Sequence, residues 1–138
     1  MNRKTQSLRM LFKQRLPTLE EYINSEFWIN DYLFIGDLAL FYIDLFQYVH
    51  LGQVTDQVYY SEVSPFIQKP HVNFIQLYQS LSQVLDELAQ IDKYRDIITT
   101  TFFEPVCDYL IRNPNLSDTF WKPFSNTTYQ LFRDTQDV

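Results

Sequence analysis

The chain contains little glycine, cysteine or histidine, and this scarcity excludes several common kinds of site. Its 138 residues include two glycines, one cysteine and two histidines. Because Gly36 and Gly52 stand alone, the chain has no glycine-rich phosphate-binding loop, and a β-rich fold with many tight turns is disfavoured. The cysteine and histidine side chains are too scattered to predict a metal site, and no motif predicts a cofactor.

The single cysteine, Cys107, also bears on the cellular compartment. A lone cysteine cannot form an internal disulfide, and unpaired cysteines are typical of proteins in a reducing environment. We therefore expect a cytoplasmic location or another reducing compartment.

Apolar and aromatic residues, by contrast, are abundant. The chain is 46% hydrophobic and 17% aromatic, and a chain of this length can bury a sizeable core in one domain. We predict an all-α fold in which residues 1–138 form a single compact bundle of about five to seven helices. Residues 32–51 are expected to form the buried central helix of that bundle.

The stretch from Tyr32 to Leu51 is apolar and aromatic on nearly every side, which is typical of a helix surrounded by other helices. We expect Asp31 to cap its start and Gly52 to cap its end. The stretch is long enough to cross a membrane, but each aspartate near its middle would cost about 2.5 to 3.5 kcal/mol to insert. We therefore expect the core helix of a soluble protein and no transmembrane span.

Two shorter stretches flank the central helix. Thr18 and Glu21 have the spacing of a capping box, which predicts a short helix over residues 18–28. Residues 53–64 contain β-branched residues and tyrosines, but no second strand is predicted nearby to pair with them. A helix is the favoured interpretation there too.

The clearest amphipathic pattern covers residues 71–92. Its apolar residues recur every three or four positions in one wide stripe, which includes Leu81 and extends to Ile91. The polar residues lie off this stripe, so the pattern predicts a helix with one face in the core.

The C-terminal third of the chain is divided by prolines. Residues 92–112 are predicted to be helical with a break or a kink near residues 103–104, because Pro105 lacks the N–H that a helix interior requires. Ser117 and Asp118 could cap a short turn that runs through Trp121, and a terminal helix is expected to begin at residue 125 or 126. Residues 134–138 are expected to fray.

The first sixteen residues form a basic amphipathic segment. They contain five basic residues and no acidic one, which leaves six basic and seventeen acidic residues in the rest of the chain. Four interpretations are open: a structural helix that contacts the acidic body, an organelle import signal, a membrane-surface helix and a phosphate-binding arm. The negative remainder disfavours the last two. The candidate residues of this basic arm are Arg3, Lys4, Arg9, Lys13 and Arg15.

Asp37 and Asp44 are seven residues apart and therefore share one face of the central helix. Two carboxylates among apolar residues could serve a small-ligand-binding module, or an enzyme with an aromatic pocket around them. The alternative is a structural role, in which tyrosine hydroxyls satisfy both acids.

The absence of catalytic motifs favours a non-enzymatic function. We predict a helical protein–protein interaction module, which would act as an adaptor or as an accessory subunit of a larger assembly. Its partner would be another protein or a second copy of this chain, while the acidic body disfavours nucleic acid. Because the chain has 24 aromatic residues, we expect some to remain exposed and to bind the partner. The candidates are Phe120, Trp121, Tyr129 and Phe132.

Overall fold

The computed structural model describes residues 8–52, 61–67 and 72–136. Within these ranges the chain is helical and contains no strand, so the all-α prediction is confirmed. In chain order, the α-helices are α1 (Leu8–Arg15), α2 (Glu20–Ile23), α3 (Asp31–Leu51), α4 (Phe74–Ala89), α5 (Asp92–Ile97), α6 (Phe103–Arg112), α7 (Ser117–Trp121) and α8 (Asn126–Gln136). Single 3₁₀ turns form η2 (Pro17–Leu19), η3 (Ser64–Phe66) and η5 (Pro114–Leu116), and a π-helical turn forms η4 (Ile98–Phe102).

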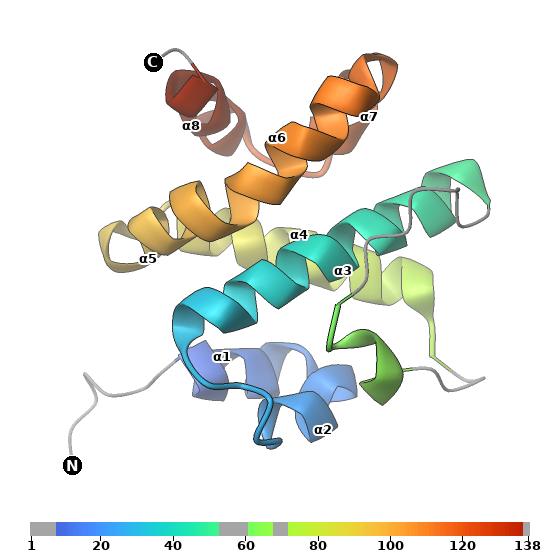
Figure 1. Cartoon of the computed structure of the whole chain (residues 1–138), viewed down its shortest axis with the longest axis vertical. Coiled ribbons are helices and arrows are strands. Elements are labelled where there is room, and N and C mark those ends of the chain that lie inside the picture. The colour runs from blue at the N-terminus through green and yellow to red at the C-terminus, as the bar shows by residue number, and fades with distance from the viewer. Residues whose placement is uncertain (1–7, 53–60, 68–71, 137–138) are drawn as a thin grey trace.

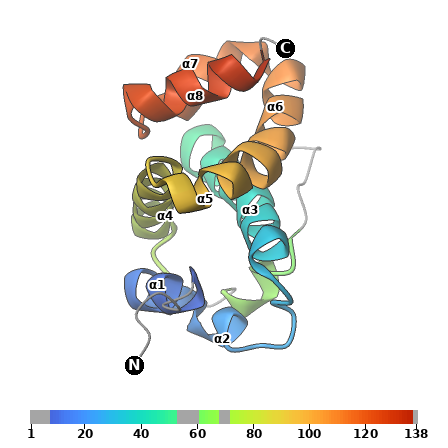
Figure 2. The ribbon, with the colours of Figure 1, turned by 90° about the vertical axis from the view of Figure 1, so that its left-hand side faces the viewer.

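The helices are arranged around α3. Figure 1 shows α3 crossing the middle of the molecule, where it contacts α4, η4 and α6. In Figure 2, α1 and α2 lie at one end of the molecule, α3, α4 and α5 lie in the middle, and α7 and α8 lie at the opposite end. α6 rises from the middle toward α7 and α8, and a single cluster of buried apolar side chains joins these elements.

The central helix α3 ends where predicted but begins one residue earlier, at Asp31, and a different residue caps its start. Asn30 is the cap, because its backbone is extended and its side chain accepts a hydrogen bond from the Leu33 N–H at 2.9 Å. Asp31 is instead the first residue of the helix. Its negative charge there interacts favourably with the positive N-terminal end of the helix dipole. Gly52 ends α3 as predicted, with a φ of 75° in the left-handed region that glycine adopts without strain.

Among the described residues, α3 is the one helix that is long and apolar enough to cross a membrane. In this fold, however, 56% of its most apolar window is buried inside the protein. Core helices of soluble proteins can be equally long and apolar, so the length and hydropathy of α3 are only weak evidence for a transmembrane helix.

α4 confirms the amphipathic pattern, although it is shorter than predicted. Asn73 caps its start by accepting a hydrogen bond from the Gln76 N–H at 3.0 Å. Its stripe is buried, with Leu81 fully enclosed. The helix ends at Ala89, however, and Ile91 is exposed beyond it. The Arg95 side chain stabilises this end, because it donates to the Ala89 carbonyl at 3.4 Å.

The helix does not break before Pro105, but it is irregular there. The chain instead passes from α5 through η4 into α6 without interruption, so the described residues form seven α-helical segments. In η4 the Phe103 N–H donates to the Ile98 carbonyl, five residues earlier, which widens the helix directly before the proline. This wider turn makes room for the ring of Pro105, which would otherwise press against the preceding turn.

The segment before α3 is less helical than its sequence predicts. Thr18 lies within η2 and caps nothing, while α2 ends at Ile23 rather than near residue 28. Pro17 fixes the 3₁₀ turn, and the Ser25 hydroxyl donates to the Tyr22 carbonyl at 2.6 Å, which competes with helix continuation.

Two further predictions concern stretches that the structure describes only in part. The helix predicted over residues 53–64 falls mostly outside the described residues, and its described end forms a turn that leads into η3. Residues 134–136, which were expected to fray, continue α8 to Gln136. The Thr135 hydroxyl donates to the Phe132 carbonyl at 2.6 Å within this last turn.

Candidate functional site

The aromatic residues that the sequence suggested for partner binding are not exposed as expected. Phe120, Trp121 and Phe132 are buried, and Tyr129 is partly buried against them. The Phe120 ring centroid lies 5.0 Å from that of Phe46 on α3, and the Trp121 ring lies 4.7 Å from Phe132. These side chains therefore belong to the core, although their role in partner binding stays a prediction.

A polar network explains why the short C-terminal helices fold back onto the bundle. Asp86 on α4 accepts hydrogen bonds from the backbone N–H of Ser125 at 3.1 Å, from its hydroxyl at 2.9 Å, and from the hydroxyl of Thr128. Gln90 adds a bond to Thr128 at 2.9 Å. The Ser125 hydroxyl also caps α8 by accepting from the Thr128 N–H at 3.2 Å. The start of α8 is thereby attached to α4, which places Phe132 over Trp121.

The described part of the basic arm is attached to the protein. The Arg9 guanidinium lies 4.6 Å from the centre of the Trp28 ring, and Lys13 lies 3.8 Å from Glu20. Arg15 donates two hydrogen bonds to Glu87 on α4, at 2.9 and 2.8 Å, which lower the pKa of that carboxyl. This part of the arm fits the interpretation of a structural helix that contacts the acidic body. Arg3 and Lys4 lie outside the described residues.

The two aspartates of the central helix have different surroundings in the structure. Asp37 accepts a hydrogen bond of 2.6 Å from the buried Tyr22 hydroxyl, as the structural interpretation of this residue predicts. Asp44 instead borders a pocket of about 200 Å³, which is lined by Phe41, Leu45, Tyr48, Ser64, Ile67 and Phe74. An aromatic pocket therefore exists beside Asp44, but Asp37 does not contribute to it.

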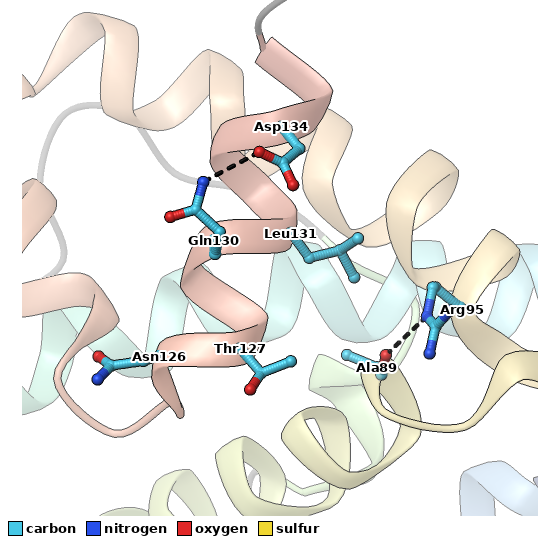
Figure 3. Close-up of a pocket in the computed structure, with 7 residues that line it drawn as sticks. All are labelled: Ala89, Arg95, Asn126, Thr127, Gln130, Leu131 and Asp134. Carbon is cyan, nitrogen blue, oxygen red and sulfur yellow. Dashed lines mark hydrogen bonds between the residues drawn. The ribbon is translucent and has the colours of Figure 1, made fainter.

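A larger hollow lies elsewhere, and neither Asp37 nor Asp44 lines it. Its volume is about 600 Å³, and Figure 3 shows it between α8 and the turn that joins α4 to α5. Arg95 on its wall bonds to the Ala89 carbonyl and pairs with Asp92 at 2.9 Å. Across the hollow, Gln130 bonds to Asp134 at 3.0 Å. The charged groups on this surface are thus engaged with the protein itself, and no nucleophile and base meet there.

Buried tyrosines form the main polar feature of the core. The Tyr42 and Tyr78 rings stack with centroids 5.1 Å apart, and the Tyr78 hydroxyl lies 3.3 Å from Nε2 of His50. Burial raises the pKa of Tyr42 and of Tyr78 above the ordinary value. Burial also raises the pKa of Tyr22, and the hydrogen bond to Asp37 raises it further. All three side chains are therefore neutral over the physiological range.

These raised pKa values predict that the protein unfolds cooperatively in alkali. In the unfolded chain the three tyrosines ionise near pH 10, whereas in the folded protein they retain their protons above that pH. The folded state then binds more protons, so its stability is intact below about pH 10 and falls above it by roughly 1.4 kcal/mol per pH unit for each tyrosine. Because the chain has ten tyrosines, only the last step in tyrosinate absorbance belongs to these three groups, and it should coincide with the loss of the helical circular dichroism signal. Ionisation of these three groups without loss of helix would contradict this.

Cys107 shows little sign of being a nucleophile. Its thiol donates to the Gln136 side chain at 2.7 Å, and partial burial raises its pKa, which disfavours the reactive thiolate. Within the described residues, no group of three or more histidine, cysteine, aspartate or glutamate side chains could hold a metal ion.

The feature that sequence reasoning missed is a group of exposed apolar side chains where α2 leads into α3. Phe27, Ile29, Tyr32 and Leu33 lie within seven consecutive residues, and their exposed fractions are 54, 74, 51 and 51%. We call these four residues the α2–α3 surface. The other exposed large apolar residues of the described chain are Met10, Tyr48, Leu51, Ile75, Ile91 and Ile111, and of these Tyr48 packs against Phe74 at 5.3 Å between ring centroids.

Local packing explains why this surface is exposed. Trp28 turns inward and stacks on Phe34 with ring centroids 3.9 Å apart, so its neighbours Phe27 and Ile29 face outward. The buried side of α3 begins with Phe34, which leaves the residues before it on the outside. The Asn30 cap does not signal this surface in the sequence, because Trp28 also precedes Asn30 and is buried, whereas Leu33 follows it within the helix and is exposed.

Comparison with known proteins adds no information about function. The chain matches no protein-family model, no curated protein and no solved structure.

Proposed function

We propose that the protein is a non-enzymatic protein–protein interaction module that binds its partner through the α2–α3 surface. The supporting observation is the clustering of four large apolar side chains, each at least half exposed, in one short segment. Monomeric proteins seldom expose contiguous apolar patches without a binding role, and aromatic residues dominate the energetics of interfaces.

The alternative, a small-ligand module at the aspartates, has weaker support. The pocket beside Asp44 is about 200 Å³, whereas ligand pockets usually measure about 300 to 1,000 Å³. The larger hollow of about 600 Å³ lacks both the aspartates and a group of aromatic side chains. Size and lining thus favour the interaction module over the ligand module.

Partner capture tests this proposal. The double substitution Ile29→Ser and Leu33→Ser should abolish capture of the partner from native extract, because it removes two apolar contacts from the surface. Both residues are exposed, so the fold should lose no more than about 1 kcal/mol. Bound proteins identified by mass spectrometry, together with light scattering for self-association, provide the measurement.

The matched control is Ile111→Ser on α6. Ile111 is 71% exposed but belongs to no such group, so its substitution should leave capture unchanged. If the double variant captures the partner as well as the parent protein does, the α2–α3 surface is not the binding site.

A further inference from the structure

The charged residues within the α2–α3 segment itself are acidic, and one cation, Arg9, lies against Trp28 at its edge. Residues 16–68 contain eight acidic residues and no lysine or arginine. Glu26 and Asp31 lie between the apolar members of the surface, and Glu26 is exposed. Glu62 precedes η3, whose Phe66 ring centroid lies 5.9 Å from that of Phe27. Acidic groups therefore border the surface from both the α2–α3 segment and the η3 segment.

The described cations nearest this end of the molecule are engaged by the protein. Arg9 is held over the Trp28 ring and donates to the Trp28 carbonyl at 3.4 Å. Lys13 pairs with Glu20 at 3.8 Å. Both come from α1, which buries its own apolar face in the core. Arg9 therefore lies against Trp28 at the edge of the surface, and Glu26 and Asp31 are the charged residues within the surface segment itself.

Two candidate binding partners for the surface come from this chain itself, namely its N-terminal residues 1–7 and a second copy, and both fit the surface poorly. Residues 1–7 lie outside the described structure and contain a single apolar residue, Met1, against the four apolar side chains of the surface. A second copy that paired the same surface with itself would bring the Glu26 and Asp31 side chains of both copies together, and like charges in an interface are repulsive.

We propose that the α2–α3 surface receives a basic amphipathic segment of another protein. This inference rests on the proposed function and specifies the chemistry of the partner. Apolar side chains of that segment contact Phe27, Ile29, Tyr32 and Leu33, while its lysine and arginine residues face Glu26 and Asp31. Complementary charges of this kind raise the rate of association and select among partners.

The test uses two synthetic probes with the full-length protein. One is a fluorescent helical peptide of about 15 leucine and lysine residues, and the other replaces every lysine with glutamate. We expect the lysine peptide to bind, as measured by fluorescence anisotropy, and the glutamate peptide to bind at least about tenfold more weakly. Equal binding of the two peptides, or preference for the glutamate peptide, would overturn the inference.

Variants show whether the binding occurs at this surface. Glu26→Gln combined with Asp31→Asn should weaken binding of the lysine peptide about tenfold, at roughly 0.7 kcal/mol for each charge. The matched control, Glu104→Gln combined with Asp108→Asn, removes two exposed acids from α6 and should change binding less than about twofold. Equal weakening by both pairs would mean general attraction to an acidic protein, and the inference would fail.

The outcomes also separate this inference from the proposed function. If Ile29→Ser with Leu33→Ser abolishes capture of the natural partner while the Glu26 and Asp31 variant binds that partner normally, the interaction module stands and the basic partner does not. If light scattering shows a dimer that the same apolar double variant dissociates, the occupant is a second copy and the inference is overturned.

Discussion

Leu81→Asp is expected to leave the protein unfolded at room temperature. Leu81 is fully buried in the middle of α4, the helix that contacts α3. Removing a buried leucine side chain costs about 2 to 5 kcal/mol. The new carboxylate adds several kcal/mol, because an unpaired charge in the core has no partner to replace water. The sum is comparable to the total stability of a domain, about 5 to 15 kcal/mol.

The control for this substitution is Gln83→Asp. Gln83 lies on the exposed side of the same helix, so the same charge should change the free energy of unfolding by no more than about 0.5 kcal/mol. Thermal unfolding followed by circular dichroism compares the two variants with the parent. A Leu81→Asp protein that melts within a few degrees of the parent would show that the stripe of α4 does not support the core.

The two long helices could be predicted from the sequence because their apolar residues repeat at a fixed spacing. In α4 the repeat predicts which face is buried, and Leu81 lies on that face. In α3 the apolar residues cover most of the circumference, which predicts a helix with neighbours on most sides. Both patterns depend only on residues within the helix itself, so local sequence is sufficient to identify them.

The ends and irregular turns of the helices were harder to predict because several side chains compete for the same backbone groups. Asn30 and Asp31 are both good N-cap residues, and the geometry of the chain before them decides in favour of Asn30. Pro105 predicts a disturbance of the helix, but the sequence does not specify whether the helix breaks or widens. The structure has the wider turn, at Ile98–Phe102.

The location of the candidate site could not be predicted because it depends on contacts between distant residues. Asp86 binds Ser125 and Thr128, which lie 39 and 42 residues further along the chain. This contact folds the C-terminal helices onto the bundle and buries Phe120 and Trp121. No periodic pattern in those short helices signals it. The exposure of the α2–α3 surface also depends on packing. Trp28 packs into the core against Phe34, and its apolar neighbours Phe27 and Ile29 are left exposed.

Phe120→Ala is expected to destabilise the protein by about 3 to 5 kcal/mol, the usual cost of removing a fully buried phenylalanine ring. Its ring centroid lies 5.6 Å from that of Tyr42, 5.0 Å from Phe46 and 5.2 Å from Trp121, so the substitution leaves a cavity between α3 and α7. Urea unfolding measures the loss as a lower midpoint with an unchanged slope.

Phe27→Ala is the matched control, because it removes the same ring from a position that is 54% exposed. We expect it to change the free energy of unfolding by less than about 1 kcal/mol and to weaken partner capture, whereas Phe120→Ala weakens capture only to the extent that the protein unfolds. For the same reason, lost capture by a Trp121→Ala variant would not identify a binding surface, since Trp121 is buried. If Phe120→Ala is as stable as Phe27→Ala, the C-terminal aromatic residues lie at the surface after all. Phe120 and Trp121 would then again be candidates for partner binding.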